Sequence, residues 1–118
     1  MSQQKIETIR SVSSGMVGRA ISTARGPELV LDSSSHPHDD VLTNSEAFLA
    51  AISSCGVTLI ESYAEEQGIA VSRMSVEIEG VRTPATVPAC FDRVSMRFQI
   101  AGVSQAQAQQ LLEVYRHR

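Results

Sequence analysis

The chain has 118 residues, of which 42% are hydrophobic and 19% charged, so it can fold as one domain (1–118) around a core. Its net charge of −3 argues against a general nucleic-acid-binding surface. No apolar stretch reaches the roughly 20 residues that span a bilayer, and the N-terminus lacks the apolar region of a signal peptide. Two cysteines do not make a disulfide framework for a chain of this size, so we expect a cytoplasmic protein with reduced thiols.

The first third of the sequence predicts a meander of three short strands. Residues with high strand propensity occupy 5–12, 16–23 and 28–32. Turn-forming residues at 13–15 and 25–27 separate these segments. We therefore expect consecutive strands to be joined by tight turns.

A Ser-, His-, Pro- and Asp-rich stretch at 32–44 predicts the longest loop, and loops of this kind often carry function. Within it, His36, His38, Asp39 and Asp40 are residue types that bind divalent metals. A proline stiffens the segment and no distant ligand is evident, so we interpret it as a solvated loop. We expect neither a metal nor a cofactor, because the sequence also lacks a Gly-rich phosphate loop and a CxxC pair.

The strongest helix signal spans 45–67 and ends at Gly68. Because no charge lies between Glu46 and Glu61, the helix is predicted to be buried nearly all round. One small sheet covers only one side of a helix, so a face of small residues could let a second helix, such as its own copy, approach closely. The apolar face contains Phe48, Ile52, Cys55, Leu59 and Tyr63, and the small-residue face contains Ala47, Ala50, Ala51, Ser54 and Thr58.

The last third predicts two strands and a helix. Apolar and polar residues alternate over 74–82 and over 90–101, as in half-buried strands, and a proline-containing loop separates them. Ser104 and Gln107 form a capping box at the start of the final helix. The order of three strands, a helix, two strands and a helix predicts an α+β domain.

Cys55 is the first candidate for chemistry. Its position about three turns into an apolar helix is also typical of a small side chain in a core. A reactive thiol must ionise, yet apolar burial raises the pKa of a thiol and the helix dipole acts mainly in the first turn. A reactive Cys55 therefore needs a cation from another element, and Arg19 and Arg25 are the candidates from the meander.

Glu46 has two interpretations. Thr43 and Glu46 have the spacing of a capping box at the start of the long helix, which contributes on the order of 1 kcal/mol. Alternatively, the Glu46 carboxylate positions an arginine beside Cys55. The two residues lie about 13 Å apart along the helix axis, so an arginine and a substrate would have to bridge them.

Residues 43–55, Thr-Asn-Ser-Glu-Ala-Phe-Leu-Ala-Ala-Ile-Ser-Ser-Cys, resemble the helix signature of the OsmC/Ohr family. That signature runs as a proline, an acidic residue, Leu-Leu, two alanines and a Ser/Ala-Cys pair, and Asn44 or Ser45 stands near the place of the proline. The order of elements matches over essentially the whole chain. The resemblance implies an α+β, OsmC-like fold and an intertwined homodimer with two long helices at its centre.

The resemblance also implies thiol-dependent reduction of organic or inorganic hydroperoxides in oxidative-stress defence. Cys55 would attack the peroxide and become a sulfenic acid, an arginine (Arg19 or Arg25) would lower the pKa of its thiol, and Glu46 would hold that arginine. A second cysteine would resolve the sulfenic acid, and a dithiol would reduce the resulting disulfide. The implied partners are a second copy, a hydroperoxide and a dithiol reductant, with no nucleic acid and no membrane.

In the family the resolving cysteine stands in a Cys-Pro step after the last long helix, where this sequence ends at Arg118. Either the chain is truncated there or this member lacks the residue. Cys90 stands elsewhere, and we interpret it as structural or exposed, with a resolving role as the alternative. The alternative functions are a non-catalytic OsmC-like dimer that binds a small apolar ligand at the dimer interface, and a dimeric scaffold in which Cys55 only packs.

Overall fold

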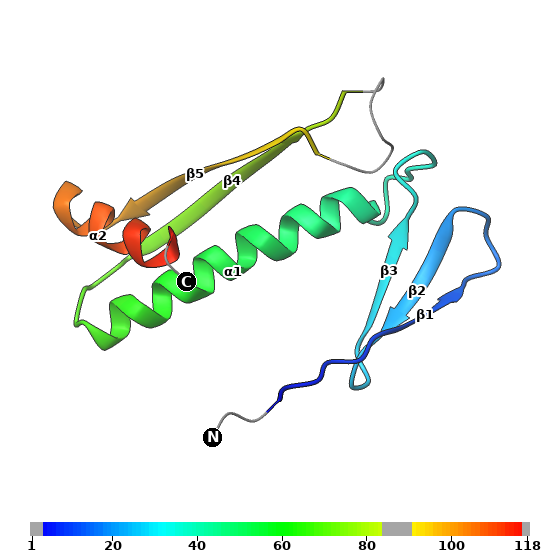
Figure 1. Cartoon of the computed structure of the whole chain (residues 1–118), viewed down its shortest axis with the longest axis horizontal. Helices are drawn as coiled ribbons and strands as arrows, with labels where there is room; N and C mark the ends of the chain where they lie inside the picture. The colour runs from blue at the N-terminus through cyan, green and yellow to red at the C-terminus, as the bar shows by residue number, and fades with distance from the viewer. Residues whose placement is uncertain (1–3, 84–90, 117–118) are drawn as a thin grey trace. The chain divides into compact units, whose positions relative to one another are not determined.

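The computed structural model describes residues 4–83 and 91–116. These residues form two antiparallel sheets and two helices, so the predicted α+β class is confirmed (Figure 1). Two compact units, Met1–Phe48 and Leu49–Arg118, make up the chain. The elements are β1 (Arg10–Ser13), β2 (Arg19–Thr23), β3 (Glu28–Asp32), α1 (Asn44–Glu66), β4 (Arg73–Val81), β5 (Arg93–Ala101) and α2 (Gln105–Arg116).

The first unit contains the predicted meander, a three-stranded antiparallel sheet in the order β1-β2-β3. Val12 pairs with Ile21, which pairs with Val30, so an apolar row crosses one face of the sheet. Arg19 on β2 pairs with Asp32 on β3, which places opposite charges on neighbouring strands. β3 has the bounds that the sequence predicts.

β1 and β2 are shorter than predicted. Their expected starts at residues 5 and 16 are wrong, because pairing begins only at Arg10 and Arg19. The chain turns through Gly15 and Gly18, whose φ angles of 100° and 90° are accessible to glycine but strained for other residues. Residues 16–18 therefore belong to the turn between the two strands.

The segment from Ser33 to Leu42, which leads from β3 to α1, folds back onto the sheet. Ser33 donates its amide to the carbonyl of Gly18 at 2.6 Å, and the amide of Asp32 donates to the carbonyl of Leu42 at 3.0 Å. Asp32 and Thr43 also form an isolated parallel bridge. The start of α1 is thus tied to the end of β3.

Both ends of α1 are capped as the sequence predicts. Thr43 Oγ1 accepts the Glu46 amide at 3.2 Å, and Glu46 Oε1 accepts the Thr43 amide at 2.9 Å. At the other end, Gly68 has a φ of 67° and the amide of Ile69 donates to the carbonyl of Ala64 at 2.9 Å. This is the Schellman pattern, in which a glycine in the left-handed region ends the helix.

α1 is only partly buried in the single chain. Its buried residues are Gly56, Ile60 and Ala64, so the chain itself covers one side of the helix, and burial of the remaining sides by a second copy stays a prediction. Phe48, on the predicted apolar face, is 55% exposed. The hairpin and α2 cover one side of the helix from Leu49 onward, and that side is centred on Gly56 and Ile60 rather than on the stripe predicted from apolar spacing.

In the second unit β4 and β5 form an antiparallel hairpin whose apolar side chains share a face. Val76 pairs with Phe98 and Ile78 pairs with Met96, which confirms the predicted alternation. β4 starts one residue before the predicted position. The predicted loop with its prolines, together with Cys90, lies outside the described residues.

α2 begins with the predicted capping box. Ser104 Oγ accepts the Gln107 amide at 3.1 Å, and Gln107 Oε1 accepts the Ser104 amide at 3.0 Å. The helix lies beside the hairpin and α1 (Figure 1). The core of this unit centres on Ile60, Ala64 and Leu111, and around them pack Tyr63, Ile69, Val71, Met74, Phe98, Ile100, Leu112 and Tyr115.

Candidate functional site

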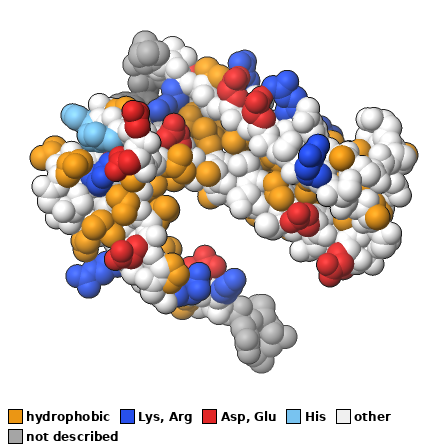
Figure 2. Space-filling model, turned by 180° about the vertical axis from the view of Figure 1, so that it is seen from behind, with side chains coloured by type: hydrophobic (Ala, Val, Ile, Leu, Met, Phe, Trp, Pro, Cys, Tyr) orange, Lys and Arg blue, Asp and Glu red, His pale blue; other side chains and the backbone are white. Residues whose placement is uncertain are grey.

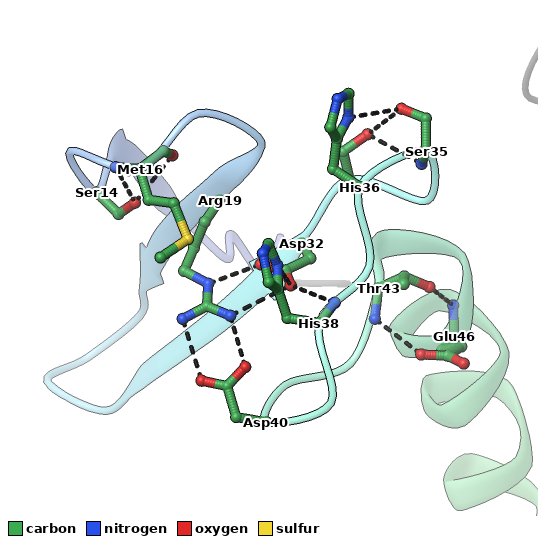
Figure 3. A network of polar contacts seen from close by, with 11 residues as sticks. Ser14, Met16, Arg19, Asp32, Ser35, His36, His38, Asp40, Thr43 and Glu46 are labelled. Carbon is green, nitrogen blue, oxygen red and sulfur yellow. Dashed lines mark hydrogen bonds and ion pairs between the residues drawn. The ribbon is translucent and has the colours of Figure 1, made fainter.

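The most densely bonded polar cluster in the first unit surrounds Asp32 (Figure 3). Asp32 is fully buried at the end of β3. Arg19 reaches it from β2 with two hydrogen bonds, from Nε to Oδ1 at 2.7 Å and from Nη2 to Oδ2 at 3.2 Å. His38 adds its backbone amide at 3.1 Å and its Nδ1 at 2.9 Å, both to Oδ2. The buried carboxylate is therefore fully used as an acceptor.

Arg19 also holds a second carboxylate. Its Nη2 and Nη1 donate to the two oxygens of Asp40, at 2.7 and 3.2 Å. Together with the bonds to Asp32, this occupies four of the five N–H donors of the guanidinium. One positive charge thus faces two negative charges, so Arg19 forms a clamp between the sheet and the following segment.

The charges in this cluster shift one another's pKa values. The hydrogen bonds from Arg19 lower the pKa of Asp32 to about 2, and the bond from His38 adds to the lowering, although burial acts in the opposite direction. Arg19 likewise lowers the pKa of Asp40. In return, the bonds to Asp32 and Asp40 raise the already high pKa of Arg19. All three groups are charged at neutral pH.

The loop predicted to be solvated is exposed, but the structure also tethers it. The side chains of His38 and Asp40 are 48% and 66% exposed, yet both bond to the sheet. His36 instead lies 3.2 Å from the hydroxyl of Ser35, and its ring packs against Gly18. Among residues 4–83 and 91–116, no three His, Cys, Asp or Glu side chains come together as a possible metal site.

Glu46 serves the capping box. Its Oε1 binds the amide of Thr43, so the structural interpretation of this residue is confirmed. No ion pair among the described residues joins Glu46 to an arginine. Oε2 of the same carboxylate takes no part in the cap, so the cap is compatible with a second role. The predicted role of Glu46 beside the thiol stays a prediction.

Cys55 is a free thiol on α1 and is exposed in the single chain. Its neighbour Gly56 is buried, so the helix presents the cysteine away from the core of its own unit. Cys55 is therefore not part of the core of its own chain, and its packing against a second copy stays a prediction. Cys55 belongs to the unit Leu49–Arg118, whereas Arg19, Arg25 and Glu46 belong to Met1–Phe48, and their predicted meeting stays a prediction.

Arg25 differs from Arg19 in its surroundings. It is exposed in the turn between β2 and β3, with a φ of 62°. Among the described residues it forms no ion pair, so its guanidinium is not neutralised there by a carboxylate.

Asp32 is not among the predicted site residues, although the sequence contains a signal for it. A charged residue at the end of a predicted strand, opposite an arginine on the neighbouring strand, is a favourable cross-strand pair. The register that joins Arg19 to Asp32 follows once the turn at 25–27 is fixed. The additional bonds to Asp40 and His38 depend on how the loop folds back.

The fold is known from solved structures. It is similar to an OsmC-like protein from Mycoplasma pneumoniae, with a TM-score of 0.84 and 13% identity over 98% of this chain and 84% of that chain. An organic hydroperoxide resistance protein OsmC from Legionella pneumophila matches with a TM-score of 0.70 and 20% identity over 98% and 85%. The organic hydroperoxide resistance protein OhrB of Bacillus subtilis matches with 0.65 and 12% over 96% and 84%. The search of curated proteins gave no match.

The fold and the helix-borne cysteine therefore define an α+β protein of the OsmC-like class. A family model described as OsmC-like protein matches residues 37–118, which is more than half of the chain. The chain belongs to the OsmC-like protein family. The matched residues include the whole of α1, with Glu46 and Cys55 on it.

By length and composition alone, α1 also meets the criteria for a membrane span, with a mean hydropathy of 1.4. A single helix of this kind is weak evidence, because core helices of soluble proteins meet the same criteria. The family model places this helix within the OsmC-like domain.

Proposed function

We propose that this protein is a cytoplasmic, Cys55-dependent hydroperoxide reductase that works as a homodimer. The observation that carries the proposal is the free, exposed Cys55 on the long helix of an OsmC-like fold. Two of the similar structures are organic hydroperoxide resistance proteins. Thiol chemistry at an accessible cysteine is the simplest activity that joins these facts.

In the proposed reaction the Cys55 thiolate attacks one oxygen of the peroxide ROOH. The S–O bond forms as the O–O bond breaks, so the sulfur is oxidised to a sulfenic acid and the leaving alkoxide takes a proton to become ROH. A dithiol reductant then attacks the sulfenic acid, releases water and forms a mixed disulfide. Its second thiol closes the reductant's own disulfide and restores Cys55.

The thiolate needs a nearby cation, because a thiolate forms most readily beside positive charge. Arg25 is the better candidate of the two predicted arginines, because four N–H groups of Arg19 already bind the carboxylates of Asp32 and Asp40. In this proposal Glu46 helps to hold that arginine with the carboxylate oxygen left free by the cap.

The apolar surface that one chain leaves open supports the proposed homodimer. Several large hydrophobic side chains are exposed in the single chain, and hydrophobic side chains form patches on the face drawn in Figure 2. α1 in particular buries few of its residues. Large exposed apolar patches mark association sites. A second copy would cover this surface, which includes Ile9, Val12, Met16, Leu29, Leu42 and Phe48.

The test measures peroxide consumption with cumene hydroperoxide and hydrogen peroxide in the presence of dithiothreitol. We expect turnover by the unmodified protein, none above background for Cys55→Ser, and retained turnover for Ser54→Ala, an exposed neighbour on the same helix. Equal rates for the unmodified protein and Cys55→Ser would reject the proposal. Light scattering at several concentrations tests the dimer separately.

A second candidate function is a non-catalytic OsmC-like dimer that binds a small apolar ligand, in a groove of one chain rather than at the dimer interface expected from the sequence. The observation that favours it is a groove of about 750 Å³ between β5 and α2, within the volume range of ligand pockets. Apolar side chains along it include Val94, Met96, Phe98, Leu112 and Tyr115. This function predicts saturable binding of anilinonaphthalene sulfonate that Cys55→Ser leaves unchanged, together with no peroxide turnover.

A further inference from the structure

The Asp32 cluster contains a histidine, His38, whose ring contacts a buried carboxylate. A histidine gains or loses its charge between about pH 5 and 8. His38 Nδ1 lies 2.9 Å from Asp32 Oδ2, and its side chain is half-exposed. The ring therefore contacts a buried carboxylate on one side and remains accessible to protons from solvent.

The charges that face His38 come from three places. They are Asp32 on β3, Arg19 on β2 and Asp40 in the same loop, and Asp39 follows His38 directly in the chain. Arg19 supplies one positive charge against the two carboxylates that it binds, so this bonded group has one net negative charge. A protonated His38 cancels that charge.

The backbone at His38 depends on the same carboxylate. The His38 amide donates to Asp32 Oδ2 at 3.1 Å, so ring and main chain are held by one oxygen. Asp32 in turn binds the carbonyl of Leu42 through its own amide. Strengthening the bond between ring and carboxylate therefore holds the whole segment 33–42 more firmly against β3.

We propose that the contact between His38 and Asp32 is a proton-sensitive latch for the segment that joins the β-meander to α1. At acidic pH the imidazolium makes a charge-assisted bond, which is roughly twice as strong as the bond of a neutral ring. At alkaline pH the neutral ring still donates through Nδ1, and the segment opens more often. The latch does not depend on peroxide chemistry, so it stands or falls separately from the proposed function.

Amide hydrogen exchange of the full chain tests the latch. Protection factors for the amides of Asp32 and residue 38, corrected for intrinsic exchange, are measured at pH 5.5 and pH 8. In the unmodified protein we expect roughly fivefold more protection at the lower pH, as a charge-assisted bond implies. His38→Gln keeps an amide donor without a titratable charge, so its protection should be the same at both pH values.

The matched control is His36→Gln. His36 lies in the same segment but its Nδ1 is near the Ser35 hydroxyl rather than a carboxylate, so the variant should keep the pH dependence. Equal protection at both pH values in the unmodified protein overturns the latch. So does a pH dependence that survives His38→Gln or disappears with His36→Gln.

Discussion

The ring of Tyr115 on α2 lies in tight contact with the position that a Cβ on Gly56 of α1 would take. A Cβ built on Gly56 would be 3.3 Å from Tyr115 Cε1 and 3.5 Å from Met96 Cε. The hydroxyl of Tyr115 also donates to Met96 Sδ at 3.5 Å, and its ring centroid is 5.6 Å from that of Phe98. The absence of a side chain at Gly56 thus lets α1, α2 and β5 meet closely.

This close approach predicts the effect of enlarging Gly56. Gly56→Leu should lower the free energy of unfolding by about 1 to 3 kcal/mol, because overpacking displaces Tyr115. The control Ser62→Leu is exposed on the same helix and should change stability by no more than about 0.5 kcal/mol. Urea unfolding measures both. Equal free energies of unfolding for the two variants would show that Tyr115 moves aside without loss of stability, which contradicts the prediction.

Gly68 and Gly102 both have a positive φ, but only Gly102 has close neighbours, so substituting each one distinguishes the cost of backbone strain from the cost of crowding. Gly68 has a φ of 67° and no atom within 4 Å of a built Cβ, so Gly68→Ala should cost about 1 kcal/mol for conformation alone. Gly102 has a φ of 90°, and its Cβ would lie 2.9 Å from the backbone nitrogen of Ser72. Gly102→Ala should therefore be clearly more destabilising in thermal unfolding. A cost no larger than that of Gly68→Ala contradicts the close approach.

The capping box gives a way to separate the two roles of Glu46. Thr43→Ala should cost about 1 kcal/mol of stability, because the Glu46 amide loses its acceptor. Glu46→Gln retains an oxygen that can accept the Thr43 amide, so stability should change little.

The same Glu46→Gln variant tests the link to the thiol. If the carboxylate holds an arginine beside Cys55, alkylation of Cys55 by iodoacetamide at pH 7 should slow several-fold. Thr43→Ala is the control, because it weakens the cap without removing the charge. Unchanged alkylation in Glu46→Gln, with the cap intact, would leave Glu46 as a cap alone.

The low pKa of Asp32 predicts acid sensitivity. Because the folded-state pKa of about 2 lies below the usual 3.8, the carboxylate stabilises the fold fully above about pH 4. That contribution is lost as the pH falls from 4 toward 2. Asp32→Asn should lower stability at pH 7 and flatten the loss across this window, as followed by circular dichroism.

Asp39→Asn is the control for the acid experiment. Asp39 is exposed in the same loop, so its substitution should leave the acid transition in place. An acid transition in Asp32→Asn as steep as that of the unmodified protein would mean that other carboxylates cause it.

Local signals predicted much of the fold because neighbouring residues determine them. The capping box of Thr43 and Glu46, the glycine that ends α1 and the alternation along β4 and β5 are all confirmed. Strand starts were less accurate, since pairing rather than propensity decides where β1 and β2 begin. Of the candidate site residues, only Glu46 has a role that the spacing of the sequence predicted and the structure confirmed, namely its part in the capping box.

The sequence by itself determined the class of fold, the helix ends and the cysteine on the long helix, because these depend on side chains a few residues apart. Only the tertiary structure decided which face of α1 is buried, since α2 and the hairpin select the stripe through Gly56 and Ile60. It also decided that Arg19 binds both Asp32 and Asp40. The Arg19 guanidinium binds the carboxylates that lie within hydrogen-bonding distance. The fold of the loop 33–42 sets that distance for Asp40, and no periodic pattern in the sequence predicts that fold.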